Sequence, residues 1–133
     1  MKTIETHKSH NVNKLYYHIV FATKYRRNTI DDQDKKVLVE ACLQKIEAKH
    51  EISFVEIGAD GDHIHFLIQS VPTLCCTHIV TLIKGITGRA LMSVKEKRAG
   101  QKEYWNDGYY VATVGERTVI ECVKWYVRNQ GKK

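Results

Sequence analysis

The stretch that decides the fold covers residues 60–71 and reads DGDHIHFLIQSV. Its opening dipeptide, Asp60-Gly61, is typical of a tight turn between two antiparallel strands. After the turn the residues alternate in polarity, and the apolar positions that would face a core are Ile64, Phe66 and Ile68. Before the turn, residues 51–59 (EISFVEIGA) are rich in residues that favour strands. Residues 51–71 are therefore predicted to form a β-hairpin with one face on the core.

The segments around this hairpin complete an α+β pattern. Residues 14–24 (KLYYHIVFATK) and 109–114 predict two more strands, and apolar residues at helical spacing predict helices over about 31–49, 75–97 and 116–129. The order β-α-β-β-α-β-α corresponds to a ferredoxin-like (RRM-like) split plan, in which two helices lie on one face of an antiparallel sheet. The C-terminal helix, which carries Tyr126, is an addition to this plan.

The composition indicates one soluble globular domain. The chain has 133 residues, one proline and no low-complexity stretch, so a single domain over 1–133 is expected, with a polar arm at 1–12. No apolar run is long enough to span a membrane, and the N-terminus lacks the apolar region of a secretory signal, so we expect a cytoplasmic protein. Lys and Arg outnumber Asp and Glu by 21 to 15, and the net charge of +6 suits a polyanionic partner.

The four cysteines indicate no metal site. Their spacing matches no zinc-binding pattern, and adjacent cysteines rarely pair with each other. We therefore interpret them as reduced, mostly buried thiols: Cys42, Cys75, Cys76 and Cys122.

Two histidines on the predicted strand form a candidate metal site. His63 and His65 are two residues apart, so both imidazoles should lie on the sheet face away from the core, with backbones roughly 6–7 Å apart. At that separation both can bind one divalent ion. A His-x-His triplet also arises by chance in chains with seven histidines, and core histidines are the alternative. Its mid-strand context favours a metal role, and oxygen ligands from elsewhere would have to complete the site.

The last predicted helix brings a phenol and an amide together. Tyr126 and Gln130 are four residues apart, which places them one above the other on a helix. An amide oxygen can complete a metal site without adding charge, and a phenol can attack an electrophile held there. The alternative is a half-buried aromatic residue and a solvated residue near the end of the helix, and the spacing does not decide between the two.

Five sequence blocks, taken in order, resemble one known family. They are TKYR at 23–26, GDHIHFLI at 61–68, LIKG at 82–85, GYYV at 108–111 with TVG at 113–115, and YVRNQ at 126–130. Together they resemble the single-tyrosine HUH transposases of the smallest insertion sequences, the TnpA-like or IS200-like family. The resemblance extends from about Leu15 to Gln130.

This resemblance implies a role for each candidate residue. His63 and His65 would be metal ligands with Gln130 as the third, and Tyr126 would be the nucleophile. The metal would be Mg²⁺ or Mn²⁺. The protein would be a homodimer with shared active sites, and it would recognise hairpins in single-stranded DNA at the element ends. Cleavage and rejoining would pass through a 5′-phosphotyrosine.

Basic and aromatic residues are candidates for contacts with the DNA backbone, although any one of them could instead be a solvated surface residue. The set is Lys24, Tyr25, Arg26, Arg27, Lys84 and Arg89. Tyr25 could also stack on a base.

Three other functions fit parts of the pattern. A non-catalytic RRM-like nucleic-acid-binding module would share the sheet plan, but it leaves the histidines and Tyr126 without a role. A domesticated relative could act on repeated chromosomal hairpins with the same chemistry. A metal-dependent hydrolase that uses water would need no tyrosine.

Overall fold

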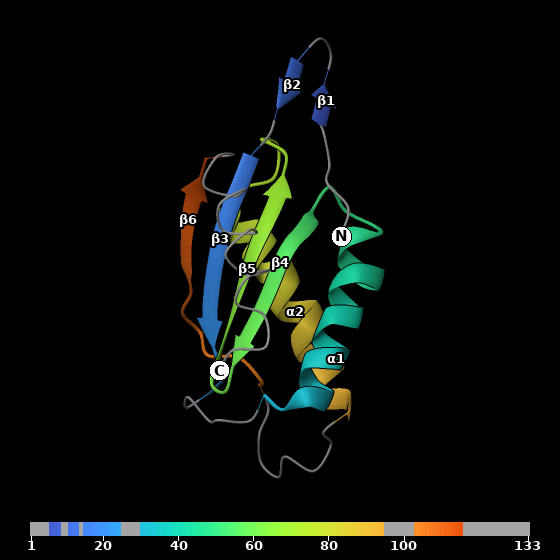
Figure 1. Cartoon of the computed structure of the whole chain (residues 1–133), viewed down its shortest axis with the longest axis vertical. Coiled ribbons are helices and arrows are strands. Elements are labelled where there is room, and N and C mark those ends of the chain that lie inside the picture. Colours follow the sequence, from blue (N-terminus) through green and yellow to red (C-terminus); the bar gives the residue numbers. More distant parts are fainter. Residues whose placement is uncertain (1–5, 9–10, 14, 25–29, 95–102, 116–133) are drawn as a thin grey trace, which may run out of the picture.

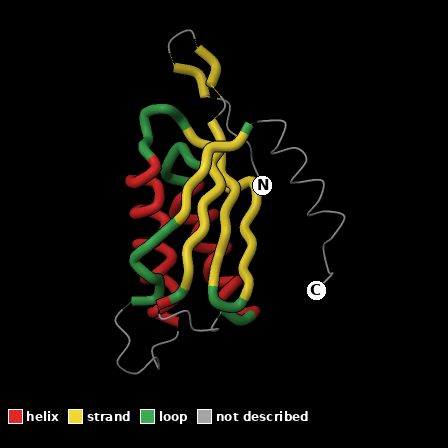
Figure 2. The backbone as a smooth tube through the Cα atoms, turned by 90° about the vertical axis from the view of Figure 1, so that its left-hand side faces the viewer, coloured by secondary structure: helices red, strands yellow, loops and turns green. Residues whose placement is uncertain are grey.

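The computed structural model of the chain describes residues 6–8, 11–13, 15–24, 30–94 and 103–115. A four-stranded antiparallel sheet is formed by β3 (Leu15–Ala22), β4 (Ser53–Asp60), β5 (His63–Ser70) and β6 (Tyr110–Val114), in the order β4-β5-β3-β6 (Figure 1). Two helices, α1 (Asp32–Ala41) and α2 (Cys76–Val94), lie together on one face of this sheet (Figure 2). The predicted α+β fold with an antiparallel sheet and two helices is confirmed. The predicted C-terminal helix falls outside the described residues.

The β4–β5 hairpin forms as predicted. Its strands pair from Ser53 opposite Gln69 to Asp60 opposite His63. Gly61, in the turn, has a φ of 65°, a conformation that glycine adopts without the steric cost that other residues meet. The hairpin therefore starts β5 at His63, directly after the turn.

The core lies between the sheet and the helices. The predicted core residues of β5 (Ile64, Phe66 and Ile68) are fully buried. They pack in one cluster with Leu38 of α1 and Ile83 of α2. Since the core side of β5 is confirmed, the side chains of His63 and His65 belong to the opposite face.

The structure differs from the sequence prediction at the N-terminus. Regular structure was expected to begin near residue 14, but a two-stranded ribbon, β1 (Thr6–Lys8) and β2 (Asn11–Asn13), precedes β3 (Figure 1). This ribbon is held by backbone pairing between short polar segments, which have no apolar periodicity to mark them in the sequence.

The first helix also differs in detail. Its predicted start is correct, because the Asp31 carboxylate caps it by accepting a hydrogen bond of 2.8 Å from the backbone N–H of Asp34. The predicted single helix to about residue 49 consists instead of α1 followed by η2, a π-helical segment (Cys42–Glu47). The Glu47 carboxylate then accepts a 2.8 Å hydrogen bond from the backbone N–H of Phe54, which links the helix to β4.

The described cysteines are free thiols, as expected. Cys42 is buried, and burial raises its pKa far above the usual thiol value, so it stays protonated. Cys75 is exposed, contrary to the expectation that these thiols are mostly buried. Within the described ranges, no helix is long and apolar enough to cross a membrane.

Candidate active site on the histidine face

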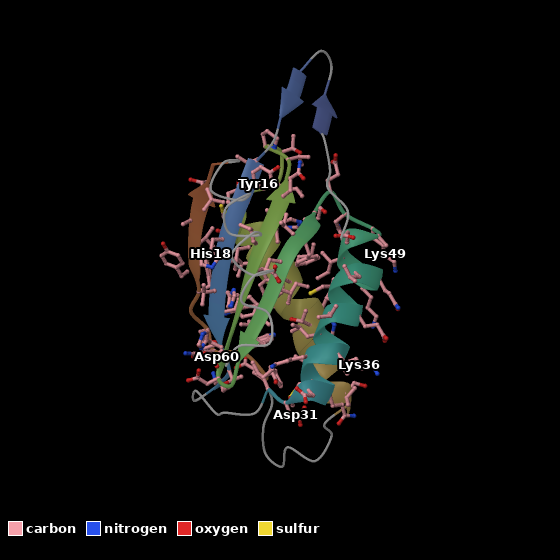
Figure 3. All side chains as sticks on the ribbon, viewed as in Figure 1. Tyr16, His18, Asp31, Lys36, Lys49 and Asp60 are labelled. Carbon is pink, nitrogen blue, oxygen red and sulfur yellow. The ribbon has the colours of Figure 1, made fainter. Side chains whose placement is uncertain are left out.

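The sheet face away from α1 and α2 carries the candidate site, and we call it the histidine face. Residues paired across antiparallel strands lie on the same face, so side chains cross it in rows, and three of these rows contain a histidine. They are Asp60–His63–Ala22, Gly58–His65–Val20–Tyr110 and Glu56–Leu67–His18–Ala112. His18 lies midway along the sheet and Asp60 at its turn end (Figure 3). The first two rows place the predicted histidine pair side by side.

His63 lies between two carboxylates of the turn. Its Nδ1 is 3.0 Å from Oδ1 of Asp62, and its Nε2 is 4.0 Å from Oδ2 of Asp60. In the tautomer that donates from Nδ1 to Asp62, Nε2 keeps its lone pair and can bind a metal ion. The surrounding negative charge also favours a cation at this position.

His65 is more enclosed than a surface histidine. Its ring lies over Gly58 of β4, and the ring of His18 stands edge-on to it at a centroid distance of 6.1 Å. Burial lowers the pKa of His65; positive charge on His18 and His63 lowers it further, while Asp60 opposes the shift. A lowered pKa keeps the imidazole neutral near pH 7, and the neutral form is the one that binds metal.

His18 is a third imidazole on this face that the sequence analysis missed. It contacts His65 on one side, and on the other its ring centroid is 6.3 Å from that of Tyr110. The sequence pointed to this face for His18 only through its position between Tyr17 and Ile19, which face the core. Because both sides of β3 are largely apolar, that alternation did not single out His18.

The two histidines supply part of a metal site. Within the described residues, no group of three or more His, Cys, Asp or Glu side chains is arranged to hold a metal ion. An imidazole pair with adjacent carboxylates suits a divalent cation, and it needs further oxygen ligands. Tyr126 and Gln130 lie outside the described residues, so their place beside the histidines stays a prediction.

Two of the predicted DNA contacts hold the segment before β6. Lys24 pairs with Glu103 at 3.1 Å and with Asp107 at 3.8 Å. The Lys84 ammonium donates to the carbonyl oxygen of Asn106 and, at 3.0 Å, to that of Gly108.

The environment of Lys84 is partly apolar. Its Nζ is 5.4 Å from the centroid of the Phe21 ring and 5.9 Å from that of the Tyr109 ring. Burial lowers the pKa of Lys84, while the carboxylates of Asp107 and Glu103 oppose the shift. Arg89 is exposed on α2. The other three predicted contacts, Tyr25, Arg26 and Arg27, lie outside the described residues.

A pocket of about 360 Å³ opens beside His63, where β3 ends and the segment before β6 begins. Its lining combines the His63 side chain, the end of β3 and the segment that Lys84 holds: Val20, Phe21, Ala22, His63, Asn106, Gly108 and Tyr109. The His63 side chain is therefore accessible from this side.

Comparison with known proteins gives consistent matches. The family model described as "Transposase IS200 like" matches residues 11–130. The transposases for insertion sequence element IS200 of Salmonella typhimurium and Salmonella typhi are each 31% identical over 118 residues, which cover 86% of this chain and 75% of theirs.

Two solved structures share the fold. A candidate transposase from Deinococcus radiodurans R1 has 27% identity and a TM-score of 0.67, with 96% of this chain and 98% of that chain covered. A REP-associated tyrosine transposase bound to a REP hairpin has 11% identity and a TM-score of 0.58, with 96% of this chain and 73% of that chain covered.

Proposed function

Because this chain belongs to the IS200-like transposase family, we propose that it cleaves and rejoins single-stranded DNA through a covalent bond to Tyr126. The observation that carries this proposal is the placement of His63 and His65 together on the sheet face away from the core, beside an open pocket. A core role for the histidines would require them to point toward the helices, where Ile64 and Phe66 lie instead.

The proposed metal ligands are His63 and His65, with Gln130 as the third. Bound Mg²⁺ or Mn²⁺ would polarise a phosphate oxygen and stabilise charge on the leaving oxygen. Asp62 would hold His63 by its Nδ1, and burial would keep His65 neutral. Two imidazoles and an amide oxygen form a donor set that fits a divalent cation.

The proposed reaction is a transesterification. The Tyr126 hydroxyl loses its proton and its oxygen attacks phosphorus, while the bond from phosphorus to the 3′ oxygen breaks and that oxygen gains one proton. The products are a 5′-phosphotyrosine and a free 3′-hydroxyl. Because one phosphoester bond replaces another, a second 3′-hydroxyl can reverse the attack and rejoin DNA without ATP.

The proposed substrate is single-stranded DNA with hairpins at the element ends. A solved neighbour is described as bound to a REP hairpin, which supports hairpin recognition here. The net charge of +6 suits DNA. Phosphate contacts are proposed for Lys24, Tyr25, Arg26, Arg27, Lys84 and Arg89. We also propose that the protein acts as a homodimer.

A second candidate is a domesticated relative that acts on repeated chromosomal hairpins. The neighbour described as bound to a REP hairpin motivates this second candidate, although its sequence is only 11% identical to this chain. The 31% identity to the IS200 transposases favours a mobile element. A binding module without catalysis, or a hydrolase that uses water, would form no covalent adduct with DNA.

The test is therefore a trapping experiment. The protein is incubated with a single-stranded hairpin substrate and Mg²⁺ or Mn²⁺, and an SDS-stable adduct is expected that Tyr126→Phe abolishes. Tyr110→Phe is the matched control, since Tyr110 is an exposed tyrosine on the histidine face. An undiminished adduct in Tyr126→Phe would assign the nucleophile to another tyrosine, and its loss in Tyr110→Phe would identify that one.

A further inference from the structure

Gly58 of β4 lies directly beneath the imidazole of His65. The two residues are partners across the β4–β5 pair. A Cβ atom built on Gly58 would overlap the ring atoms Cε1 and Nε2 of His65, far inside any normal contact distance. The place that a side chain would take at position 58 is therefore filled by the histidine ring.

The backbone gives no reason for a glycine here. Of the described glycines, Gly61 is the one with a positive φ, so the conformation of Gly58 is open to other residues. Glycine in a strand is unfavourable relative to residues with a side chain, and β4 is an edge strand. A glycine inside a strand often marks a place where another group approaches closely, and at Gly58 that group is the His65 ring.

His65 is also bounded on its other side. The ring of His18, from β3, stands edge-on to it at a centroid distance of 6.1 Å. The His65 ring thus has a defined place between β4 and His18, and a side chain at position 58 would force it out of that place.

We propose that Gly58 is a positioning residue for the metal centre, because its missing side chain determines where the His65 imidazole lies. The inference rests on the proposed function of His65 as a metal ligand. Groups that orient a metal-binding histidine commonly change metal affinity by about 10- to 100-fold when altered. A displaced ring should have a similar effect.

The first test measures binding of Mn²⁺ alone to the full chain by isothermal titration calorimetry. Gly58→Ala is expected to raise the Kd about 10- to 100-fold, and His65→Ala should raise it at least as much. Gly115→Ala is the matched control, since a Cβ there meets nothing within 4 Å. Wild-type affinity in Gly58→Ala, together with loss in His65→Ala, would overturn the inference and leave the metal centre standing. Wild-type affinity in His65→Ala would overturn the metal centre, and this inference with it.

The second test needs neither metal nor DNA. In the metal-free protein, Gly58→Ala should lower the midpoint of urea unfolding because the ring and the new methyl group compete for one place. In a His65→Ala background that conflict is absent, and the same substitution should leave the midpoint unchanged or raise it. Gly115→Ala should have the same effect in both backgrounds. Equal effects of Gly58→Ala in both backgrounds would show that the ring and the glycine are independent, which contradicts the proposal.

Discussion

The Nδ1 atom of His63 lies 3.0 Å from the Oδ1 atom of Asp62, the residue immediately before it. Consecutive residues of a strand point to opposite faces, so this contact is possible because Asp62 belongs to the turn and β5 begins at His63. The backbone of Asp62 is itself anchored, since its carbonyl oxygen accepts a 2.8 Å hydrogen bond from the N–H of the buried Thr23. The turn therefore presents a carboxylate to His63 from a fixed position.

Replacing this carboxylate should weaken metal binding. Asp62→Ala removes the group that fixes the tautomer and orientation of His63, and we expect the Kd for Mn²⁺ to rise about 10- to 100-fold. The measurement is calorimetric titration of the metal-free protein. Glu40→Ala, at an exposed acidic position on α1, is the charge-matched control and should bind as the wild type does. Equal affinity in the two variants would mean that Asp62 does not orient a ligand.

Truncation of His63 and of Ile64, neighbours in β5, should affect different properties: the first activity, the second stability. His63 has a partly exposed side chain on the histidine face, so His63→Ala opens no cavity. The free energy of unfolding of this variant should differ from that of the wild type by less than about 1 kcal/mol, while its cleavage activity is lost. Ile64 is fully buried, and Ile64→Ala should cost about 2–5 kcal/mol. Urea unfolding and a cleavage assay separate the two effects. A large loss of stability in His63→Ala would restore the core-histidine alternative.

The sequence was sufficient to predict the hairpin and its two faces. An Asp-Gly dipeptide selects a turn that glycine favours, and alternation assigns Ile64 to the core and His63 to the other face. These are local properties, because each depends on residues within a few positions of one another. The same local signals located the helix start at Asp31.

What could not be predicted depends on contacts between distant segments. His18 reaches His65 through the register of β3 against β5, which no local pattern determines. Gly58 could be recognised as a glycine in a strand, but the ring above it follows from the pairing of β4 with β5. The change from α1 to η2 at Cys42 likewise has no evident signal in the sequence.

Lys84 should contribute to stability through the segment that it holds. Lys84→Met removes the donor to the carbonyl oxygens of Asn106 and Gly108, and we expect a loss of about 1–2 kcal/mol in the free energy of unfolding. Lys36→Met, at an exposed position on α1, is the matched control and should change stability little. Unchanged stability in Lys84→Met would contradict this role.

The same variant tests the predicted DNA contact of Lys84. A lysine that also binds a phosphate contributes to the salt dependence of hairpin binding, and its removal lowers the slope of log K against log salt by about one. We expect this decrease in Lys84→Met and none in Lys36→Met. An unchanged slope would limit Lys84 to its role in holding the segment before β6.

The last prediction concerns how the tyrosine meets the histidines. If the predicted C-terminal helix forms, its apolar stripe needs a surface to bury: Val119, Ile120, Val123 and Val127. The histidine face carries an apolar cluster of the buried Tyr16 and Leu67, with the partly buried Val55 and Val114 packed against it. At about 25 cal/mol per Å², covering four such side chains would contribute several kcal/mol. We expect the surface to belong to a neighbouring subunit, so that each active site combines two chains.

Mixing two inactive variants tests this arrangement. One subunit carries Tyr126→Phe and the other carries His63→Ala, and subunit exchange is first confirmed with tagged chains. If sites are shared, a mixed dimer joins the intact histidines of one subunit to the intact tyrosine of the other in one of its two sites, so partial cleavage should return. If each site is built from a single chain, the mixed dimer has no intact site. Cleavage that stays absent despite confirmed exchange would therefore rule out shared sites and favour a tyrosine helix that serves its own subunit.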